Sequence, residues 1–325
     1  MSGVKCINKK ILSVVMAVSF SLSATACRTD IKEPYSLYSS IEKYGLAPKA
    51  NSTLLGEQVA HLPQKDSAAA STNEQLAKAC GAFNDTTLST IYSQKADKKI
   101  YPASTTKILT AYVALKYGDL NEVYTVSENA CNQAADSSVA GLHPGDRITL
   151  RDLLKAMLVV SGNDASVAIA EGISGSTEEF AKLMNEEALR LGATHSHFVN
   201  PNGLHDDQHY TTVYDMYLIF HAAITEPVFL KIIKARKCNV TYTDASGNVV
   251  KKQYIPTNYY KTGEAKAPKG ITAIGGKTGT TGKAGYCLVL LSENESGENL
   301  ISIVYKATDR YSLYTMMNRL LLSFL

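Results

Sequence analysis

Strand-like runs lie at both ends of the folded part of this chain, while helical patterns fill its middle. Residues 76–83 and 88–94 near the start, and 285–291 and 300–305 near the end, have the apolar pattern of strands. Between them, apolar residues recur at helical spacing, as in 150–158, and a last amphipathic helix follows the final strand. Strands from both ends bury their apolar faces best in one shared sheet. The pattern therefore predicts an α+β fold with one antiparallel sheet packed by helices.

The net charge of +3 belongs entirely to the first ten residues. Lys5, Lys9 and Lys10 lie there without any acidic residue, and the rest of the chain has 30 basic against 30 acidic residues. A neutral remainder gives no reason to expect a nucleic-acid-binding surface. A length of 325 residues with 45% hydrophobic residues is typical of a globular protein with a substantial core.

The first 26 residues are predicted to be a signal peptide. The three lysines precede 17 uncharged residues, and Ala24 and Ala26 form an A-x-A cleavage site. A transmembrane helix needs about 20 mostly apolar residues, whereas this run is shorter and rich in Ser. We therefore expect cleavage, and with it export to the outside of the cytoplasmic membrane.

Cys27 would be the first residue after that cleavage. This position resembles a bacterial lipobox, in which the new N-terminal Cys is acylated, although Ala24 stands where lipoboxes usually carry Leu. Two alternatives remain open, a membrane-anchored lipoprotein and a secreted protein. Residues 27–75 have no sustained period and are predicted to be a tether or linker. The folded domain is expected to cover residues 76–325.

No motif in the sequence predicts a metal or cofactor site. Cys80, Cys131, Cys238 and Cys287 show no C-x-x-C spacing, and their disulfide state stays open. A metal site is conceivable in a cluster of histidines that lies close to Asp206 and Asp207. The cluster consists of His195, His197, His205 and His209. We interpret it as a solvated loop instead.

A Ser-x-x-Lys motif stands at the predicted start of a helix, in Pro102-Ala103-Ser104-Thr105-Thr106-Lys107. Ser104 and Lys107 are three residues apart, so their side chains share one helix face. A Ser hydroxyl is a weak nucleophile until a base removes its proton, and a neutral Lys can be that base. Since the reference pKa of Lys is about 10.4, neutrality near pH 7 requires a drop of roughly three units, through burial or a second cation.

The triplet Ser161-Gly162-Asn163 follows an apolar helical run. Ser161 could relay a proton, and Asn163 could hold a substrate carbonyl or Lys107. The same triplet also fits an ordinary helix end, with Gly162 ending one helix and Asn163 or Asp164 capping the next.

A Lys-Thr-Gly motif lies within Gly276-Lys277-Thr278-Gly279-Thr280. A Walker A loop would need an earlier Gly where Ile271 stands, and would lead into a helix rather than a strand, which argues against ATP binding. Lys277 with the two Thr hydroxyls suits a carboxylate instead. Gly279 allows close approach of the backbone to a ligand.

The three motifs occur in one order, 57 and 116 residues apart, and this set is typical of β-lactamases and penicillin-binding proteins. Residues 76–325 resemble the D-alanyl-D-alanine carboxypeptidases, the low-molecular-mass penicillin-binding proteins. Residues 198–204 and 209–216 also look like that family's middle region. The resemblance implies a β-lactamase/transpeptidase-like fold, with a five-stranded antiparallel sheet flanked by helices and a helical subdomain. It also implies a member without the C-terminal β domain that many relatives carry.

The resemblance assigns catalytic roles by position. Ser104 would be acylated by the penultimate D-Ala carbonyl, with Lys107 as general base. Ser161 would relay a proton toward the leaving amine, and Asn163 would order the site.

The resemblance also assigns substrate contacts. The terminal carboxylate would bind Lys277, Thr278 and Thr280, with Gly279 between them. The backbone N–H groups of Ser104 and Thr280 would form the oxyanion hole.

The expected function is therefore a serine-type D-Ala-D-Ala carboxypeptidase that acts on peptidoglycan stem peptides through an acyl-enzyme and binds β-lactams. A class A-like β-lactamase is the nearest alternative. That class needs a Glu about 36 residues after the second motif, and residues 192–198 contain none. A DD-endopeptidase or transpeptidase of the same fold, and a non-catalytic sensor on the same scaffold, are further alternatives, although no motif residue is missing.

Overall fold

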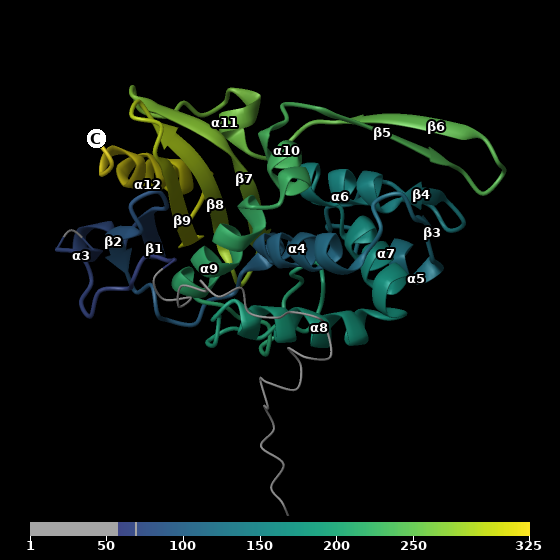
Figure 1. The fold of residues 1–325 in the computed structure, drawn as a ribbon, viewed down its shortest axis with the longest axis horizontal. Helices are drawn as coiled ribbons and strands as arrows, with labels where there is room; N and C mark the ends of the chain where they lie inside the picture. The colour runs from purple at the N-terminus through teal and green to yellow at the C-terminus, as the bar shows by residue number, and fades with distance from the viewer. Residues whose placement is uncertain (1–57, 69) are drawn as a thin grey trace, which may run out of the picture. The chain divides into compact units, whose positions relative to one another are not determined.

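The computed structural model describes residues 58–68 and 70–325. The predicted signal peptide, Cys27 and the first part of the predicted linker lie outside the described residues. Elements are labelled as in Figure 1.

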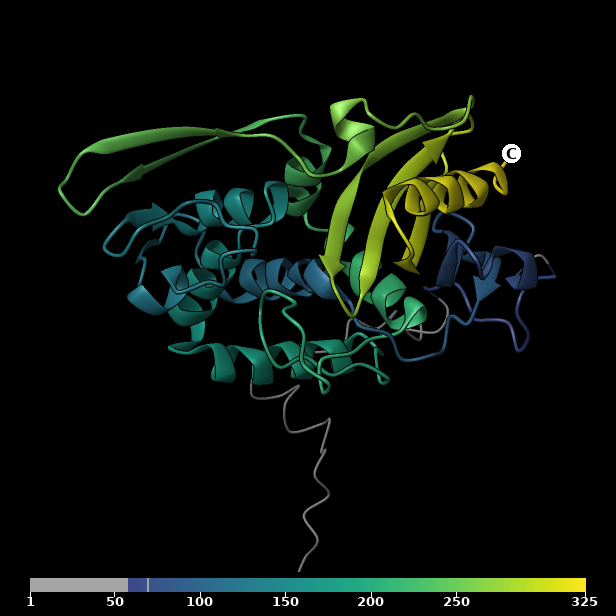
Figure 2. The same cartoon turned by 180° about the vertical axis from the view of Figure 1, so that it is seen from behind.

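A five-stranded antiparallel sheet is built from both ends of the described chain, as predicted (Figures 1 and 2). Its order is β2-β1-β9-β8-β7, so the first strand pairs with the last one. A turn joins the first two strands, and the last two strands form a hairpin. The bounds are β1 Ala77–Asn84, β2 Ser89–Gln94, β7 Ile271–Thr281, β8 Gly285–Asn294 and β9 Asn299–Ala307.

Both faces of this sheet are covered, because side chains of a strand point alternately to opposite faces. Leu288 and Leu290 of β8 pack with β1, β9 and the C-terminal helix α12 (Arg310–Leu322). Val289 and Leu291 belong to the main core on the other face, which includes residues of helices α4 and α9. Burial on both sides explains why these strands appear in the sequence as continuous apolar runs.

Helices occupy the middle of the chain, and side-chain caps set several of their starts. Thr149, Ser176 and Thr212 each accept a hydrogen bond from the backbone N–H three residues later. The helices are α4 Lys107–Tyr117, α5 Glu128–Cys131, α6 Leu150–Val159, α7 Asn163–Ser174, α8 Thr177–Arg190, α9 Val213–Ile224, α10 Pro227–Lys234 and α11 Tyr259–Thr262.

A second, four-stranded sheet of order β3-β4-β5-β6 lies beside the helical region. Its longest pairing is the hairpin of β5 (Cys238–Thr243) and β6 (Val249–Tyr254). Strands β3 (Val123–Thr125) and β4 (Arg147–Thr149) have three residues each, too few to show a period of two.

The predicted end of the linker at residue 75 lies too late. Val59 and Ala60 are buried, and the Ala60 N–H donates to the Tyr217 hydroxyl over 2.9 Å. A short helix, α3 (Ala70–Asn73), ends at Asn73, whose side-chain amide donates to the Tyr92 hydroxyl. Residues 58–68 and 70–75 therefore belong to the folded domain. Their buried residues are few and irregularly spaced, so the sequence has no period there that would predict a folded segment.

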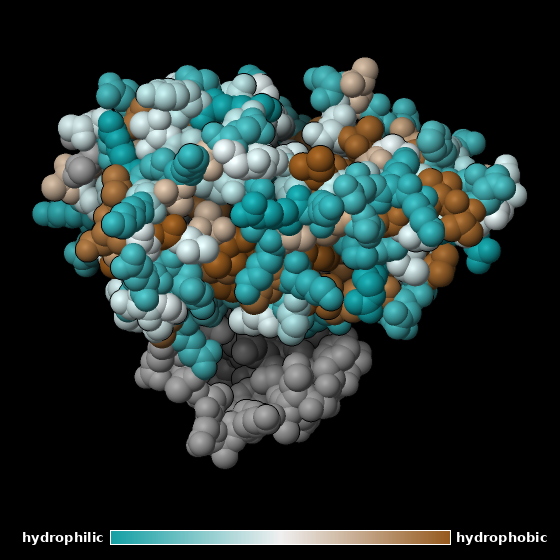
Figure 3. Space-filling view, turned by 90° about the horizontal axis from the view of Figure 1, so that it is seen from above, coloured by the Kyte–Doolittle hydropathy of each residue, from teal (hydrophilic) through white to brown (hydrophobic). Residues whose placement is uncertain are grey.

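No single described helix is long and apolar enough to cross a membrane; α9 and α10 pass only as a pair bent by 102°. Viewed from the side of β5, β6 and α11, hydrophilic residues cover most of the surface (Figure 3). The four described cysteines, Cys80, Cys131, Cys238 and Cys287, are free thiols.

Candidate active site

Ser104 lies in a tight 3-10 turn, η2 (Ala103–Thr106), directly before α4. Ala103 enters this turn with a left-handed φ of 48°, an uncommon conformation for a residue with a side chain. A neighbouring loop packs directly against the turn at Gly203. A Cβ added to Gly203 would lie 1.9 Å from the Ala103 carbonyl oxygen, so there is no room for a side chain. Gly203 has a φ of 85°, so only glycine suits this position.

The two residues after Ser104 anchor the turn with buried hydrogen bonds. Thr105 Oγ1 donates to the Pro102 carbonyl over 2.7 Å and lies 2.8 Å from the Tyr305 hydroxyl. Thr106 Oγ1 lies 2.8 Å from Nε2 of His209. Both residues that follow Ser104 are therefore held in place, and with them the turn that carries Ser104.

His209 is a buried structural residue, which corrects its interpretation as part of a solvated loop. Its Nδ1 accepts the Val199 N–H over 3.1 Å, so Nε2 carries the proton and donates to Thr106. Burial lowers the pKa of His209 to about 4, which keeps the ring neutral. Within residues 58–68 and 70–325, no group of three or more His, Cys, Asp or Glu side chains is placed to hold a metal ion.

Lys107 is completely buried, and its Nζ contacts three oxygens. Ser104 Oγ lies 3.0 Å away, Asn163 Oδ1 2.7 Å and the carbonyl oxygen of Asn202 2.7 Å. The predicted pairing of Ser104 with Lys107 and Asn163 is therefore present. The sequence did not single out Asn202 as a functional residue, although it lies in the family-like segment 198–204.

The electrostatics around Lys107 favour its neutral form. Burial lowers its pKa well below the ordinary value, and the nearby Lys277 ammonium lowers it further, while Asp164 opposes them. A neutral amine has two protons and one lone pair. The Asn202 carbonyl and the Asn163 side-chain oxygen can only accept, so they take the two protons. The lone pair is left for Ser104, the one partner that can donate.

The second motif wraps a tight bend at the start of α7. Ser161 has a left-handed φ of 65°, and Gly162 is the residue before the helix. The Asp164 carboxylate accepts the N–H groups of Ala140, Leu142 and Ala165. These bonds tie the segment before α6 to the bend and hold Ser161 in its strained conformation.

Lys277 is also fully buried and contacts the second motif. Its Nζ donates to Ser161 Oγ and to the Thr278 carbonyl, each over 2.8 Å. Burial lowers the pKa of Lys277 to about 7. The two lysines thus come from separate elements, Lys107 from α4 and Lys277 from β7. Lys277 lowers the pKa of Lys107.

A cavity of about 150 Å³ opens in front of these groups. The predicted residues that line it are Ser104, Ser161, Thr278, Gly279 and Thr280. Lys107, Asn163 and Lys277 are buried and are not part of the lining. Lys107 contacts the Ser104 hydroxyl and Lys277 the Ser161 hydroxyl, whereas Asn163 contacts Lys107. The lysine predicted to bind a carboxylate therefore does not face the cavity.

Arg310 supplies the cation in the described lining of this cavity, and the sequence did not predict it. Its guanidinium lies 5.3 Å from the centre of the Tyr259 ring and donates to the Tyr259 hydroxyl. Arg310 is the first residue of α12. No motif surrounds it, so only the pairing of β9 with β8 and β1 brings it to the site.

Strand β7 runs close beside the turn that carries Ser104. A Cβ on Gly279 would lie 3.0 Å from the Ser104 nitrogen and 3.0 Å from the Pro102 oxygen. A glycine at this position lets the backbone of β7 approach the nucleophile's own N–H. Two backbone donors, from Ser104 and Thr280, can then face one oxyanion.

A scan against family models matches residues 66–309 to peptidase family S11, described as D-alanyl-D-alanine carboxypeptidase. This match covers most of the chain and includes all three motifs. The chain belongs to this family.

Curated members of the S11 family align with most of the described domain. The chain is 34% identical over 222 residues to the D-alanyl-D-alanine carboxypeptidase DacF of Bacillus subtilis, covering 67% of this chain and 54% of that protein. It is 36% identical over 226 residues to DacC of Escherichia coli, covering 66% and 53%. The chain thus spans about half the length of these relatives.

Solved structures show the same fold over a greater share of their length. The Streptomyces K15 DD-transpeptidase matches with a TM-score of 0.71 and 28% identity, covering 76% of this chain and 96% of that one. A D-alanyl-D-alanine carboxypeptidase from Mycobacterium tuberculosis matches with a TM-score of 0.63 and 26% identity, covering 77% and 86%. The β-lactamase/transpeptidase-like fold class is therefore confirmed.

Replacing Gly279 with Ala is expected to slow acylation of this S11 site by about 10²-fold, because the new Cβ would push β7 away from the Ser104 N–H. Gly282 lies just after the same strand, and a Cβ added there would meet no atom within 4 Å, so Gly282→Ala is the matched control. The rate of labelling by a fluorescent penicillin measures both variants. Equal rates for the two would contradict this role of Gly279.

Proposed function

We propose that this protein is a serine-type D-Ala-D-Ala carboxypeptidase that acts on peptidoglycan stem peptides and binds β-lactams. The observation that carries the proposal is the set of contacts of Lys107. Its Nζ lies 3.0 Å from Ser104 Oγ, and its other two partners can only accept protons. Family membership and the named carboxypeptidase relatives support the same activity.

In the proposed acylation step, Lys107 takes the hydroxyl proton while Ser104 Oγ attacks the carbonyl of the penultimate D-Ala. The backbone N–H groups of Ser104 and Thr280 stabilise the oxyanion. The proton then passes to the leaving nitrogen through Ser161, whose Oγ accepts a hydrogen bond from Lys277. The C–N bond breaks, and D-Ala leaves with its amine protonated.

In the proposed deacylation step, water attacks the ester carbon. Lys107 again accepts the proton, and Ser104 is restored when the C–O bond of the ester breaks. A carboxylic acid with one residue fewer is the second product.

Recognition of the terminal carboxylate is proposed to involve the outer wall of the cavity. Thr278 and Thr280 contribute hydroxyls, and Arg310 contributes a cation. Lys277 lies behind them and adds positive charge in its protonated form. A substrate with a free carboxylate would therefore bind better than one whose end is capped.

Slow β-lactam turnover is expected rather than β-lactamase activity. The lining of this cavity, as far as the described residues show it, includes no Asp or Glu that could activate water. Asp164, the carboxylate at the Ser161 bend, is buried and accepts three backbone N–H groups. The class A-like route, in which a carboxylate activates the water that hydrolyses a penicilloyl ester, is thus absent from the described lining.

The test incubates residues 58–325 with a peptide ending in D-Ala-D-Ala and measures free D-Ala. Release of one D-Ala per peptide supports the proposal. A parallel incubation with excess glycine separates hydrolysis from transpeptidation, because a transpeptidase would transfer the acyl group to that amine. Absence of D-Ala release in both incubations, with a folded protein, would overturn the assignment.

Replacing Arg310 with Gln is expected to weaken the preference for a free terminal carboxylate by about tenfold, since one charge-assisted hydrogen bond is lost. The ratio of kcat/KM for the free acid and its C-terminal amide measures this preference. Arg319, on the same helix, contacts Asn73 and does not line the cavity, so Arg319→Gln is the control. An unchanged ratio in Arg310→Gln would contradict carboxylate binding there.

The proposed location is outside the cytoplasmic membrane, attached by a lipid on Cys27 or secreted. The supports are the n-region, the small residues before Cys27, and a substrate that is made outside that membrane. Labelling of wild-type cells and of Cys27→Ala cells with radioactive palmitate tests the lipid. Equal labelling of the protein in both would exclude acylation at Cys27.

A further inference from the structure

A second cavity, of about 410 Å³, lies apart from the catalytic residues and is lined by an unusual set of cations. Its lining includes five lysines and one acidic residue, Asp207. The lysines are Lys78, Lys95, Lys98, Lys99 and Lys306, and we refer to this cavity as the lysine pocket. The catalytic mechanism uses none of them.

Two of the five lysines already have acidic partners. Lys95 pairs with Glu74 at 2.9 Å and Lys98 with Asp97 at 3.0 Å. Lys99 lies 3.9 Å above the centre of the Tyr210 ring, on the wall of the pocket. The lone carboxylate of the lining is occupied too, because Asp207 accepts the Tyr101 hydroxyl.

Lys78 and Lys306 form no ion pair with any described residue, and both line the lysine pocket. Strands β1 and β9 are antiparallel, with Ala77 opposite Ala307 and Ala79 opposite Tyr305. Counting along this register puts Lys78 and Lys306 at the same level of the two strands. Like charges at one level of neighbouring strands repel. Glu74 attracts Lys78 as well as Lys95, and a bound anion would lower the remaining repulsion.

Backbone strain occurs at both sites. Five described residues other than glycine have a positive φ, and one of them, Leu88, lies in the turn between β1 and β2. Ala103 and Ser161 belong to the active site, whereas Lys95 (48°) and Lys306 (55°) line the lysine pocket. Such conformations cost free energy and concentrate where a side chain must be aimed at a ligand.

The chemistry of the lining indicates the class of ligand. Several lysine ammonium groups, each a compact point charge, suit a ligand with several anionic oxygens, such as a phosphate. The planar fork of arginine, which binds carboxylates and phosphates through two parallel bonds, is absent from the described lining of this pocket. Ala79, Ile100 and two tyrosine rings give the remaining wall an apolar character. We propose that the lysine pocket binds a phosphate group on a larger ligand, with Lys78 and Lys306 as its principal contacts.

The pocket lies next to the catalytic turn along the chain. Tyr101, on its wall, precedes Ser104 by three residues, and Ile100 bridges to Thr211. A bound phosphate, on a lipid headgroup or on a polymer, would thus contact the segment of chain that leads into the active-site turn. Phosphate binding here does not depend on the reaction at Ser104.

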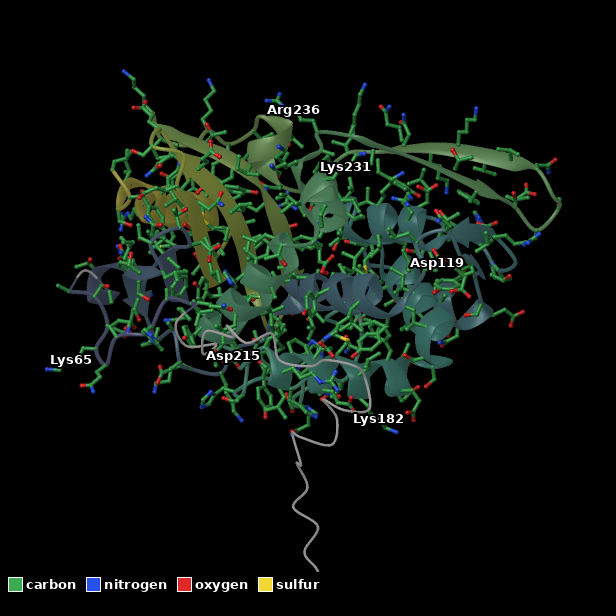
Figure 4. The ribbon with its side chains drawn as sticks, viewed as in Figure 1. Lys65, Asp119, Lys182, Asp215, Lys231 and Arg236 are labelled. Carbon is green, nitrogen blue, oxygen red and sulfur yellow. The ribbon has the colours of Figure 1, made fainter. Side chains whose placement is uncertain are left out.

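Calorimetric titration of residues 58–325 with inorganic pyrophosphate tests the pocket, at an ionic strength of about 0.15 M so that exposed charges are screened. Wild type is expected to bind saturably at one site. Lys78→Gln/Lys306→Gln should bind at least about tenfold more weakly, because two charge-assisted contacts are lost. Lys182→Gln/Lys231→Gln removes the same charge elsewhere, on α8 and α10 (Figure 4), and should bind like wild type. Absence of saturable binding, or an equal loss in both double variants, would overturn the proposal.

The melting temperature provides a second readout that needs no ligand affinity. Without phosphate, Lys78→Gln alone should raise the melting temperature, since it removes the like-charge pair with Lys306. Pyrophosphate should raise the melting temperature of wild type but not of Lys78→Gln/Lys306→Gln. A melting temperature lowered by Lys78→Gln would contradict a net repulsion between Lys78 and Lys306. Unchanged penicillin labelling in these variants verifies that the fold and active site are intact.

Sedimentation with vesicles distinguishes the two sources of phosphate. Binding to phosphatidylglycerol vesicles but not to phosphatidylcholine vesicles, lost in Lys78→Gln/Lys306→Gln, would support a lipid headgroup. Binding to pyrophosphate without binding to either vesicle would support a soluble or polymeric phosphate.

Discussion

Replacing Ser104 with Ala is expected to abolish covalent labelling by penicillin and to reduce D-Ala release by roughly 10⁴-fold or more. The variant keeps the turn, because Thr105 and Thr106 hold it through Tyr305 and His209. It removes the one partner of Lys107 that can give up a proton. Mass spectrometry of the protein after incubation with benzylpenicillin measures the adduct directly.

Ser161→Ala is the informative companion to Ser104→Ala. It removes a hydroxyl from the same cavity and a partner of Lys277, yet leaves the proposed nucleophile in place. We expect slower labelling in Ser161→Ala, with the adduct still on Ser104. A penicilloyl adduct in Ser104→Ala would refute the assignment of the nucleophile.

Replacing Lys107 with Met is expected to lower the acylation rate by about 10²- to 10⁴-fold, the usual contribution of a general base. Met is unbranched and similar in length, so it can occupy the buried channel between Ser104 and Asn163. Exposed Lys182, replaced with Met, serves as the control for an unrelated loss of charge. Near-wild-type acylation in Lys107→Met would show that another group activates Ser104.

The pH profile of acylation provides the second readout for Lys107. Protonated Lys107 cannot accept a proton, so the rate should rise as pH passes through its lowered pKa and then level off. The Lys277 ammonium helps to lower that pKa. Lys277→Met should therefore shift the rising part of the profile to higher pH, in addition to any change in rate. A shift to lower pH would contradict the coupling of the two lysines.

The motifs in the sequence predicted residues that the structure brings together, but they could not show which of these side chains line the cavity. Ser104 with Lys107, and Ser161 with Asn163, are each close in sequence, so helix geometry indicates their proximity. Whether Lys277 faces the cavity depends on how β7 packs against the bend at Ser161, 116 residues earlier in the chain, which no local pattern records. Its Nζ turns inward to Ser161, and Arg310 provides the cation of the described lining instead.

The fold was predictable where apolar residues repeat over a sufficient length. Strands β1, β2, β8 and β9 of the large sheet and helix α12 have six or more residues each, and their apolar patterns predicted them. Strands β3 and β4 are too short to show a period. Residues 58–75 attach through single contacts such as the Ala60 N–H to Tyr217, which depend on a side chain 157 residues away.

The pairing of β1 with β9 has a consequence for how this protein folds. These strands are joined by more than 200 residues of chain, so the central pair of the sheet forms only after a very large loop has closed. The ribosome must synthesise the chain through β9 before β1 can find this partner. Until then the edge of β1 that pairs with β9 stays open, so the large sheet is completed late.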